Sequence, residues 1–410
     1  MTWLTTPSHH RWLEAESARL LTFGRASRIS RGGFGGLDAA GQLPEGAEAE
    51  LWITCRMTHC YSLATLMGHP GSAALVDHGI DALRGRLRDH DHGGWFAAVG
   101  EDGPTNDAKQ AYAHAFVVLA ASSAVAAKRP DAAELLDDAL AVIEERFWDD
   151  DAGMTLEDFS RDWSESEDYR GLNSTMHMVE AFLAAADATG NRVWLDRALR
   201  IVERVMDRFA PSHDWRLPEH FDADWTPLLS YNEDDPKHPF RPFGATIGHG
   251  FEWARLTVQL SLSLQQRGLV APEWMLQAAR SLYDASARDG WNVDGERGFV
   301  YTVNWEGEPV VRERMHWVSA EAIAAAAVLW RATKLPLFAE NYQDWWDFAG
   351  DHHLDFEGGS WWHELDPQLQ VAGTVWPGKV DLYHALQATL IPRLPVTPSL
   401  AASLAASNLD

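Results

Sequence analysis

The sequence predicts an all-α protein, specifically an (α/α)6 barrel of six helical hairpins with long loops on one face. Apolar residues recur at helical spacing in twelve blocks, and no alternating strand pattern of comparable length interrupts them. Short and long connections join these blocks, and a polar group follows each long connection. The chain has 410 residues, a length at which barrels often form a single domain. We therefore expect one catalytic domain over residues 1–410.

The predicted helices are blocks whose length and periodicity are typical of amphipathic or buried helices. In chain order they cover about 8–25, 49–68, 70–88, 107–127, 131–147, 171–189, 192–209, 244–267, 272–288, 316–333, 336–349 and 379–392. The tail from about residue 393 is punctuated by proline and rich in small residues, so we expect it to be loosely packed.

The long connections hold most of the Gly, Pro, Asp and Trp residues, which predicts loops or small hairpins on one face. They cover 89–106, 148–170, 210–243, 289–315 and 350–378. The chain has 20 tryptophans against 16 phenylalanines, and many stand beside Gly, Asp or His, as in DHGGWF and GGSWWHELD. Such tryptophans suit walls that stack on sugar rings, although large aromatic residues also plug the ends of a wide helical core.

The amino-acid composition argues against some classes of binding partner. The formal charge is -26, with no Lys/Arg cluster of the kind that binds phosphates, so we expect neither nucleic acid nor an anionic membrane as a partner. No window approaches the ~18 apolar residues of a membrane span, and the amino terminus has no cationic leader followed by an apolar core. Cys55 and Cys60 are too few for a disulfide framework, which fits the cytoplasm. The oligomeric state stays open, with a homo-oligomer among the alternatives.

One polar group stands near the start of every second helix, which is the periodic feature that predicts a site. In a barrel of helical hairpins, the inner helices would carry these groups to a common mouth. The groups are Arg56 and His59, Tyr112 and His114, Asn173 with His177 and Glu180, His249 and Glu252, Trp317 and Glu321, and Asp381 and His384. His249 and Glu252 would share one helix face at i, i+3.

Histidine is the side chain whose ordinary pKa lies near neutrality, so two histidines facing one substrate can act as acid and base. Neighbouring carboxylates would orient the imidazoles and hold sugar hydroxyls. No HExxH pattern indicates a metal site, and His249 precedes Glu252, the reverse of the Glu-x-x-His order of di-iron bundles. No GxSxG, P-loop or GxGxxG indicates an acyl enzyme or a nucleotide. We therefore expect no metal and no cofactor.

Three separated motifs carry a family resemblance: YRGLNSTMHMVEAFLAA, RPFGATIGHGFEWARL and GKVDLYHAL. In this order they resemble the N-acylglucosamine 2-epimerase superfamily, specifically its aldose–ketose isomerase branch, over nearly the whole chain. The resemblance implies an (α/α)6 barrel, in agreement with the helix count. It also implies a small monosaccharide as substrate.

Carried across motif by motif, the resemblance implies that His249 and His384 are the paired catalytic histidines. The substrate-binding residues that it implies are Arg56, Tyr112, His114, Asn173, His177, Glu252, Trp317 and Glu321. The expected reaction interconverts D-mannose and D-fructose, or related sugars such as lyxose and xylulose, through a cis-enediol. In that reaction His249, held by Glu252, would open the sugar ring and His384 would move the proton between C2 and C1, with Arg56 stabilising charge at the carbonyl oxygen.

Alternatives stay open from the sequence. A sugar 2-epimerase would differ only in the face that is reprotonated; Gln387, where the epimerase pattern has Arg, favours the isomerase. A glycoside hydrolase would need two carboxyl groups, for which the candidates are Asp91, Glu219 and Glu364. A sulfonated hexose would need an added cation, for which the candidates are Arg216, Lys237 and Arg241. The last alternative is a protein that binds sugar without turning it over.

Overall fold

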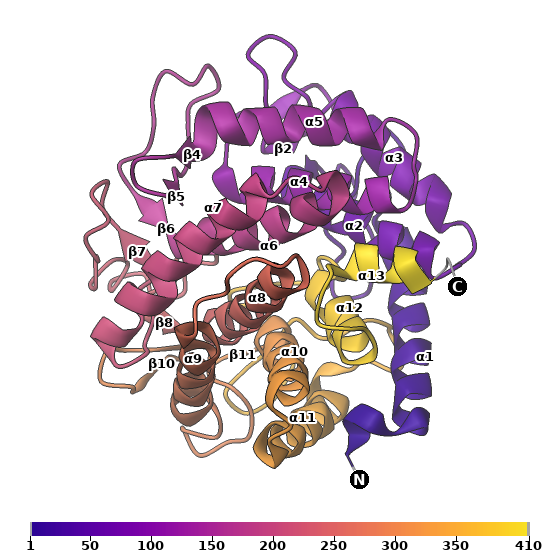
Figure 1. Ribbon diagram of the computed structural model, residues 1–410. Helices are drawn as coiled ribbons and strands as arrows, with labels where there is room; N and C mark the ends of the chain where they lie inside the picture. Colours follow the sequence, from indigo (N-terminus) through magenta and orange to yellow (C-terminus); the bar gives the residue numbers. More distant parts are fainter. Residues whose placement is uncertain (1, 408–410) are drawn as a thin grey trace. The chain divides into compact units, whose positions relative to one another are not determined.

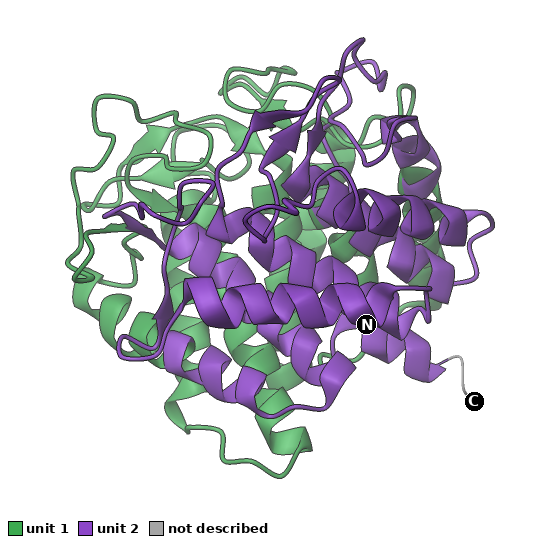
Figure 2. Cartoon of the chain, turned by 90° about the horizontal axis from the view of Figure 1, so that it is seen from above, with its two compact units in different colours: residues 1–20, 202–379, 384–397 green, residues 21–201, 380–383, 398–410 purple. Residues whose placement is uncertain are grey.

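The structure, a computed structural model, describes residues 2–407 and divides the chain into two compact units (Figure 2). Unit 1 contains residues 1–20, 202–379 and 384–397, and unit 2 contains residues 21–201, 380–383 and 398–410. Both units consist mainly of helices joined by loops that hold very short strands (Figure 1). The prediction of a single catalytic domain over residues 1–410 stays a prediction.

In unit 2, α2, α4 and α6 pack side by side and bury nearly every side chain, while α3 packs on α2 and α5 on α4. α7 lies beside α6, where Trp194 stacks on Phe182 with ring centroids 5.4 Å apart. The helices are α2 (Leu51–Leu66), α3 (Ser72–Arg84), α4 (Ala111–Ala126), α5 (Ala132–Val142), α6 (Leu172–Thr189), α7 (Val193–Val202) and α13 (Leu400–Ser407). The unit is thus built from helical hairpins with a buried first helix and an outer second helix.

Unit 1 repeats this arrangement: α8 and α10 pack together, α9 covers α8, and α11 covers α10. The helices are α8 (Ile247–Gln266), α9 (Trp274–Gly290), α10 (His316–Thr333), α11 (Pro336–Phe348) and the greater part of α1 (Pro7–Phe23) and of α12 (Tyr383–Leu390). The buried helix α10 is rich in alanine, whereas α9 and α11 each expose one polar face. Small side chains let the inner helices approach closely, and amphipathic ones suit the outer layer.

Short strands stand directly before most of the inner helices and fix where those helices begin. β1 (Ala49–Glu50) precedes α2, β6 (Arg170–Gly171) precedes α6, β8 (Ala245–Thr246) precedes α8, and β11 (Arg314–Met315) precedes α10. Three of them have antiparallel partners within their own unit: β1 pairs with β2 (Ala98–Val99), β8 with β9 (Thr302–Val303), and β11 with β12 (Glu364–Leu365). The remaining strands are β3 (Pro104–Asn106), β4 (Trp148–Asp149), β5 (Met154–Thr155), β7 (His220–Phe221) and β10 (Pro309–Val311).

All twelve predicted helices are present, with differences at their ends. Three outer helices finish in π-helical turns: η3 (Ile143–Phe147), η4 (Glu203–Phe209) and η6 (Ala349–His353). The last predicted helix is shorter than expected, because Asp381 accepts a hydrogen bond from the Tyr383 amide at 2.7 Å and starts α12 there. The 3-10 turns are η1 (Trp3–Thr5), η2 (Gly24–Ser27), η5 (Pro211–His213) and η7 (Ile391–Arg393).

The carboxy-terminal tail contains a helix that periodicity did not predict. α13 buries Ala401, Ser403 and Leu404 and packs against α2, α4 and α6. Its short run of small residues has too few turns for a reliable periodic signal.

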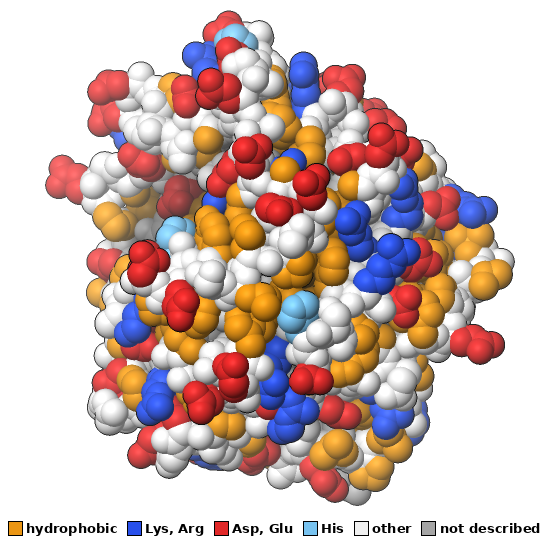
Figure 3. Space-filling view, turned by 90° about the vertical axis from the view of Figure 1, so that its left-hand side faces the viewer, with side chains coloured by type: hydrophobic (Ala, Val, Ile, Leu, Met, Phe, Trp, Pro, Cys, Tyr) orange, Lys and Arg blue, Asp and Glu red, His pale blue; other side chains and the backbone are white. Residues whose placement is uncertain are grey.

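The surface shown in Figure 3 carries acidic side chains over much of its area, with basic and apolar ones between them. This mixture agrees with the formal charge of -26. In the part of the chain that the structure describes, no helix is long and apolar enough to cross a membrane.

Candidate active site

Two clusters of buried or half-buried side chains, one in each unit, contain most of the candidate residues that the sequence indicated. The histidine cluster of unit 1 consists of Glu219, His249, Glu252, Arg255, Trp317, Glu321 and His384. The arginine cluster of unit 2 consists of Arg56, Tyr112, His177, Glu180, Asp381 and Tyr383. Most of these side chains lie within the first three turns of the inner helices, on the side where the short strands precede those helices.

His249 stands between two glycines that let α8 approach its neighbours. A Cβ atom at Gly248 would lie 2.2 Å from Cζ3 of Trp317, and one at Gly250 would lie 2.1 Å from Oγ of Ser286 on α9. The Ile247 amide donates to Tyr301 O at 3.1 Å, which ties the start of α8 to the 301–311 hairpin. The motif IGHGFEW therefore places His249 on a tightly packed helix end.

A buried carboxylate orients His249. Nδ1 of His249 lies 3.0 Å from both carboxylate oxygens of Glu219, which precedes β7. We expected Glu252 to hold His249; the structure gives that place to Glu219 and puts Glu252 beside Arg255, with Nη2 3.3 Å from Oε1. The reason is the fold of the 210–243 loop, which brings Glu219 to a residue 30 positions later in the chain.

His384 has a matching arrangement. Nδ1 of His384 lies 2.8 Å from Oε1 of Glu321, and the other oxygen of Glu321 accepts from Nε of Arg255 at 3.0 Å. Glu321 and Arg255 are both buried. Glu321 therefore accepts from a guanidinium and an imidazole at the same time.

The indole ring of Trp317 contacts the imidazoles of both His249 and His384. Its ring centroid lies 5.1 Å from that of His249 and 5.6 Å from that of His384, with the planes inclined by 38° and 36°. The side chain is half-buried, one helical turn before Glu321 on α10. Two imidazoles, each held at Nδ1 by a carboxylate, thus flank one aromatic surface.

The carboxylates of the histidine cluster raise the question of a metal. Glu252, Glu321 and His384 have ligand atoms within 4.8 Å of one another. Arg255 already supplies a positive charge to both carboxylates, and Oε1 of Glu321 is engaged by His384. A divalent ion would have to displace Arg255, so this donor set fits a guanidinium better than a metal.

The arginine cluster is built around a buried guanidinium. Arg56 donates to Asp381 at 3.0 Å and to the Tyr112 hydroxyl at 2.8 Å. The guanidinium carbon also lies 4.5 Å from the ring centroid of Phe116 and 4.6 Å from that of Tyr383. Burial opposes the charge, yet Tyr112, Asp381 and Tyr383 together raise the pKa of Arg56 above its ordinary value. This side chain is a fixed cation.

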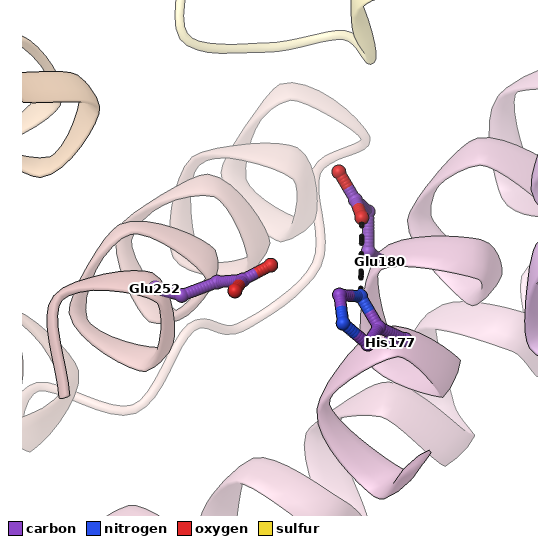
Figure 4. Close-up of side chains that lie close together, drawn as sticks. All are labelled: His177, Glu180 and Glu252. Carbon is purple, nitrogen blue, oxygen red and sulfur yellow. Dashed lines mark ion pairs between the residues drawn. The ribbon is translucent and has the colours of Figure 1, made fainter. Parts of the chain in front are cut away.

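His177 and Glu180 of the arginine cluster lie one turn apart on α6 (Figure 4), with 3.8 Å between Nδ1 and Oε2. The Tyr383 hydroxyl donates to Glu180, and the ring of Tyr112 lies edge-on to His177 at 5.2 Å. Asn173 is half-buried in the first turn of the same helix. Arg56, Tyr112, Asn173 and His177 thus all occupy inner helices, as predicted.

His114 does not fit its predicted role in substrate binding. Nδ1 contacts Gln110 O at 2.7 Å, and Nε2 accepts from the Trp95 amide at 3.2 Å. Both ring nitrogens are therefore engaged by the backbone, and burial lowers the pKa of His114 to about 3. His59 is similarly enclosed, with Nδ1 2.7 Å from Oγ of Ser123. His114 is a buried neutral residue that holds a loop in place.

The three carboxylates that were candidates for a hydrolase already make other contacts. Glu364 accepts from the amides of residues 374, 375 and 376 and from the Thr374 hydroxyl, at 2.7–2.8 Å. Asp91 is exposed and paired with Arg161 at 3.0 Å, and Glu219 is bonded to His249. All three candidate carboxylates are thus engaged in other contacts, which does not suit the carboxyl pair of a hydrolase.

The sequence patterns do not indicate Arg255 or Tyr383, and they suggest another role for Glu219. Arg255 could have been found, because HGFEWAR places it one further turn along the face that carries His249 and Glu252. Glu219 lies in a long loop, and no spacing rule connects it to His249.

Comparison with known proteins shows the family of this chain. The N-acylglucosamine 2-epimerase (GlcNAc 2-epimerase) profile matches residues 32–388. A D-mannose isomerase of Pseudomonas cannabina pv. alisalensis is 52% identical over 403 residues, which cover 98% of this chain and 97% of that protein. A D-mannose isomerase of Thermobifida fusca is 51% identical over 406 residues, covering 98% of each chain.

A crystal structure of a D-mannose isomerase superposes with a TM-score of 0.87 and 28% identity, covering 95% of this chain and 99% of that one. The predicted all-α (α/α)6-barrel fold class is thereby confirmed, and so is the resemblance that the three motifs carry. The chain belongs to the N-acylglucosamine 2-epimerase family.

Proposed function

We propose that this chain is an aldose–ketose isomerase that interconverts D-mannose and D-fructose by moving a proton between C2 and C1 through a cis-enediol. Its similarity to D-mannose isomerases, at 51–52% identity over nearly the full length, supports this substrate. The observation that carries the mechanism is the bonding of both imidazoles through Nδ1 to buried carboxylates, with each imidazole in ring contact with Trp317.

These bonds set the tautomer of each histidine. A carboxylate accepts the Nδ1 proton, so Nε2 of a neutral imidazole presents its lone pair away from the carboxylate. Such a nitrogen takes a proton from carbon or oxygen and returns it, and the carboxylate stabilises the imidazolium that forms in between. His249 with Glu219 and His384 with Glu321 are therefore two separate acid/base pairs.

In this mechanism His249 opens the sugar ring by moving a proton between the anomeric hydroxyl and the ring oxygen. His384 then takes the proton from C2, exchanges it with solvent and protonates C1, while a second proton moves from the C2 hydroxyl to the C1 oxygen. Arg56, a fixed cation, stabilises the charge that develops on the carbonyl oxygen.

The same proposal assigns sugar binding to the remaining predicted residues other than His114. They are Arg56, Tyr112, Asn173, His177, Glu252, Trp317 and Glu321. Hydroxyl, amide and carboxylate groups hold sugar hydroxyls, and an indole face stacks on the sugar ring.

Two of the three candidate cations of the 210–243 loop are already paired with acids, which favours a neutral sugar over a sulfonated hexose. Arg216 donates to Asp289 at 2.8 Å, and Lys237 forms an ion pair with Glu313. Both charges are already balanced by acids of unit 1. Competition of mannose, lyxose and a sulfonated hexose in one assay should therefore show the neutral sugars turning over faster.

The test of the proposed function is incubation with D-mannose in heavy water. Fructose should form as the first product and carry deuterium at C1, before and after exhaustive chelation. Glucose as the first product would indicate 2-epimerisation, the activity named for a more distant relative, a cellobiose 2-epimerase of Bacteroides fragilis. Fructose without deuterium, or loss of activity on chelation, would contradict the metal-independent proton transfer.

The proposal places the enzyme in the cytoplasm, which the two buried free thiols, Cys55 and Cys60, support. Fractionation of the source cells tests this assignment. Sedimentation of the purified chain would decide whether it forms a homo-oligomer.

A further inference from the structure

We propose that Arg255 is a positioning residue that sets the proton affinity of His384 through Glu321, and thereby the lowest pH at which the isomerase works. Only the kinetic test of this inference, the pH dependence of kcat/KM, rests on the proposed function. Its physical basis is an unbroken set of contacts from α8 to α10 and then to α12.

The contacts leave little freedom to Arg255. Its Nε donates to Glu321 at 3.0 Å, its Nη2 to Glu252 at 3.3 Å and its Nη1 to Gln259 at 3.1 Å. The Arg255 and Glu321 side chains are 2% and 1% exposed, so solvent screens their charges weakly. A planar guanidinium in this setting fixes both the position and the ionised state of Glu321.

The charges around His384 decide the sign of the effect. From α8 come Glu252 and Arg255; from α10 come Glu321 and the uncharged ring of Trp317. Asp381 precedes α12 in the chain and is paired with Arg56. With Arg255 in place, two carboxylates and one guanidinium leave one net negative charge beside the imidazole; without Arg255 there would be two.

More negative charge beside an imidazole strengthens proton binding. His384 must be neutral at Nε2 to take the C2 proton, so a His384 that is already protonated is inactive. By offsetting one carboxylate, Arg255 keeps His384 neutral down to a lower pH. The acidic limb of kcat/KM reports this protonation in the free enzyme.

Arg255→Met should move this limb to higher pH by about 1 unit, the low end of the effect that one nearby charge has on a pKa. The rate defect should shrink as the pH is raised. Arg255→Lys keeps the charge and should leave the acidic limb near its wild-type position. It should lower kcat, because one ammonium group cannot reproduce the planar guanidinium that donates to both Glu321 and Glu252. Gln259→Ala, which removes only the neutral contact, is the matched control. An unmoved limb in Arg255→Met, or an equal shift in Gln259→Ala, would overturn the proposal.

A second measurement needs no substrate and separates this inference from the proposed function. The His384 ring can be titrated by NMR in protein labelled at histidine Cε1, with its signal identified by its loss in His384→Ala. Arg255→Met should raise the titration midpoint of His384. Glu252→Gln removes a negative charge from the same group and should lower it, which keeps the test decisive if Arg255→Met does not fold. Equal midpoints in the wild type and both variants would refute the role of Arg255, even if mannose turns over as proposed.

Discussion

Gly248 lies against the indole of Trp317 so closely that a Cβ atom at Gly248 would sit 2.2 Å from ring carbon Cζ3. Gly248→Ala should therefore push Trp317 out of its place beside the two imidazoles. We expect kcat/KM for mannose to fall by about 10-fold to 100-fold, the usual loss when a substrate surface moves by about 1 Å. The free energy of unfolding should fall by about 1–3 kcal/mol, the cost of overpacking.

A double-mutant cycle checks the cause of that loss. Trp317→Leu removes the ring that the new methyl group would strike, so adding Gly248→Ala to Trp317→Leu should cost little further stability. Urea denaturation of the four proteins measures this coupling. Additive losses would mean that the effect of Gly248 does not pass through Trp317.

The two histidines should fail in different ways when replaced. His384→Ala should lose about 10³-fold in turnover and stop washing deuterium into C2 of mannose, because that exchange needs the first proton abstraction. His249→Ala should recover when an open-chain analogue is supplied, since only ring opening is lost. Turnover and exchange measured for both variants test the assignment. Normal exchange in His384→Ala would make that histidine structural.

Glu219→Gln should behave as a weaker form of His249→Ala. The amide keeps the size of the side chain but no longer stabilises an imidazolium, and such changes lower turnover by about 10² to 10⁴. The open-chain analogue should ease this defect. Glu233 lies exposed in the same loop, and Glu233→Gln provides a control that should retain full activity. A Glu219→Gln enzyme with wild-type rates would show that His249 does not depend on its carboxylate.

Acid should destabilise the fold through its buried neutral histidines. Burial lowers the pKa of His114 to about 3 and that of His59 to about 4, against an ordinary value of 6.5. Below pH 6.5 these histidines therefore bind protons in the unfolded chain but not in the folded chain. The free energy of unfolding is thus highest above pH 6.5 and falls as the pH drops toward 4. At pH 5, His114 alone should account for a loss of about 2 kcal/mol.

Urea unfolding at pH 7.5, 6 and 5 measures this slope. His114→Gln can keep one bond to the Gln110 carbonyl and one from the Trp95 amide but cannot titrate, so its stability should fall less steeply with acid. Replacement of the exposed His90 by glutamine should leave the slope unchanged. A wild-type slope in His114→Gln would mean that other groups control acid stability.

The helices could be predicted because each inner helix is long, apolar and bounded by Gly-rich loops, so periodicity is unambiguous. The π-helical turns that end α5, α7 and α11 could not, since a single inserted residue hardly alters a periodic pattern. α13 is too short to show a period at all.

In the candidate site, the residues on helices could be predicted from the sequence, but the contacts made by loops could not. His249, Glu321 and His384 stand at regular positions on inner helices, so their burial could be predicted from spacing. His114 has the same spacing but points its nitrogens at the backbone of residues 95 and 110, a difference that depends on loop geometry. Glu219 reaches His249 only through the path of the 210–243 loop, which local sequence patterns do not determine.

The two thiols of α2 have a practical consequence. Cys55 is 0% exposed and Cys60 is 1% exposed, and burial raises the pKa of each thiol well above its ordinary value. A thiol-reactive dye should therefore label the native enzyme only when α2 opens, because the thiolate is the reactive form and needs access to solvent. The chain thus carries its own reporter of opening, and labelling rates measured with and without sugar would show how far substrate closes the fold.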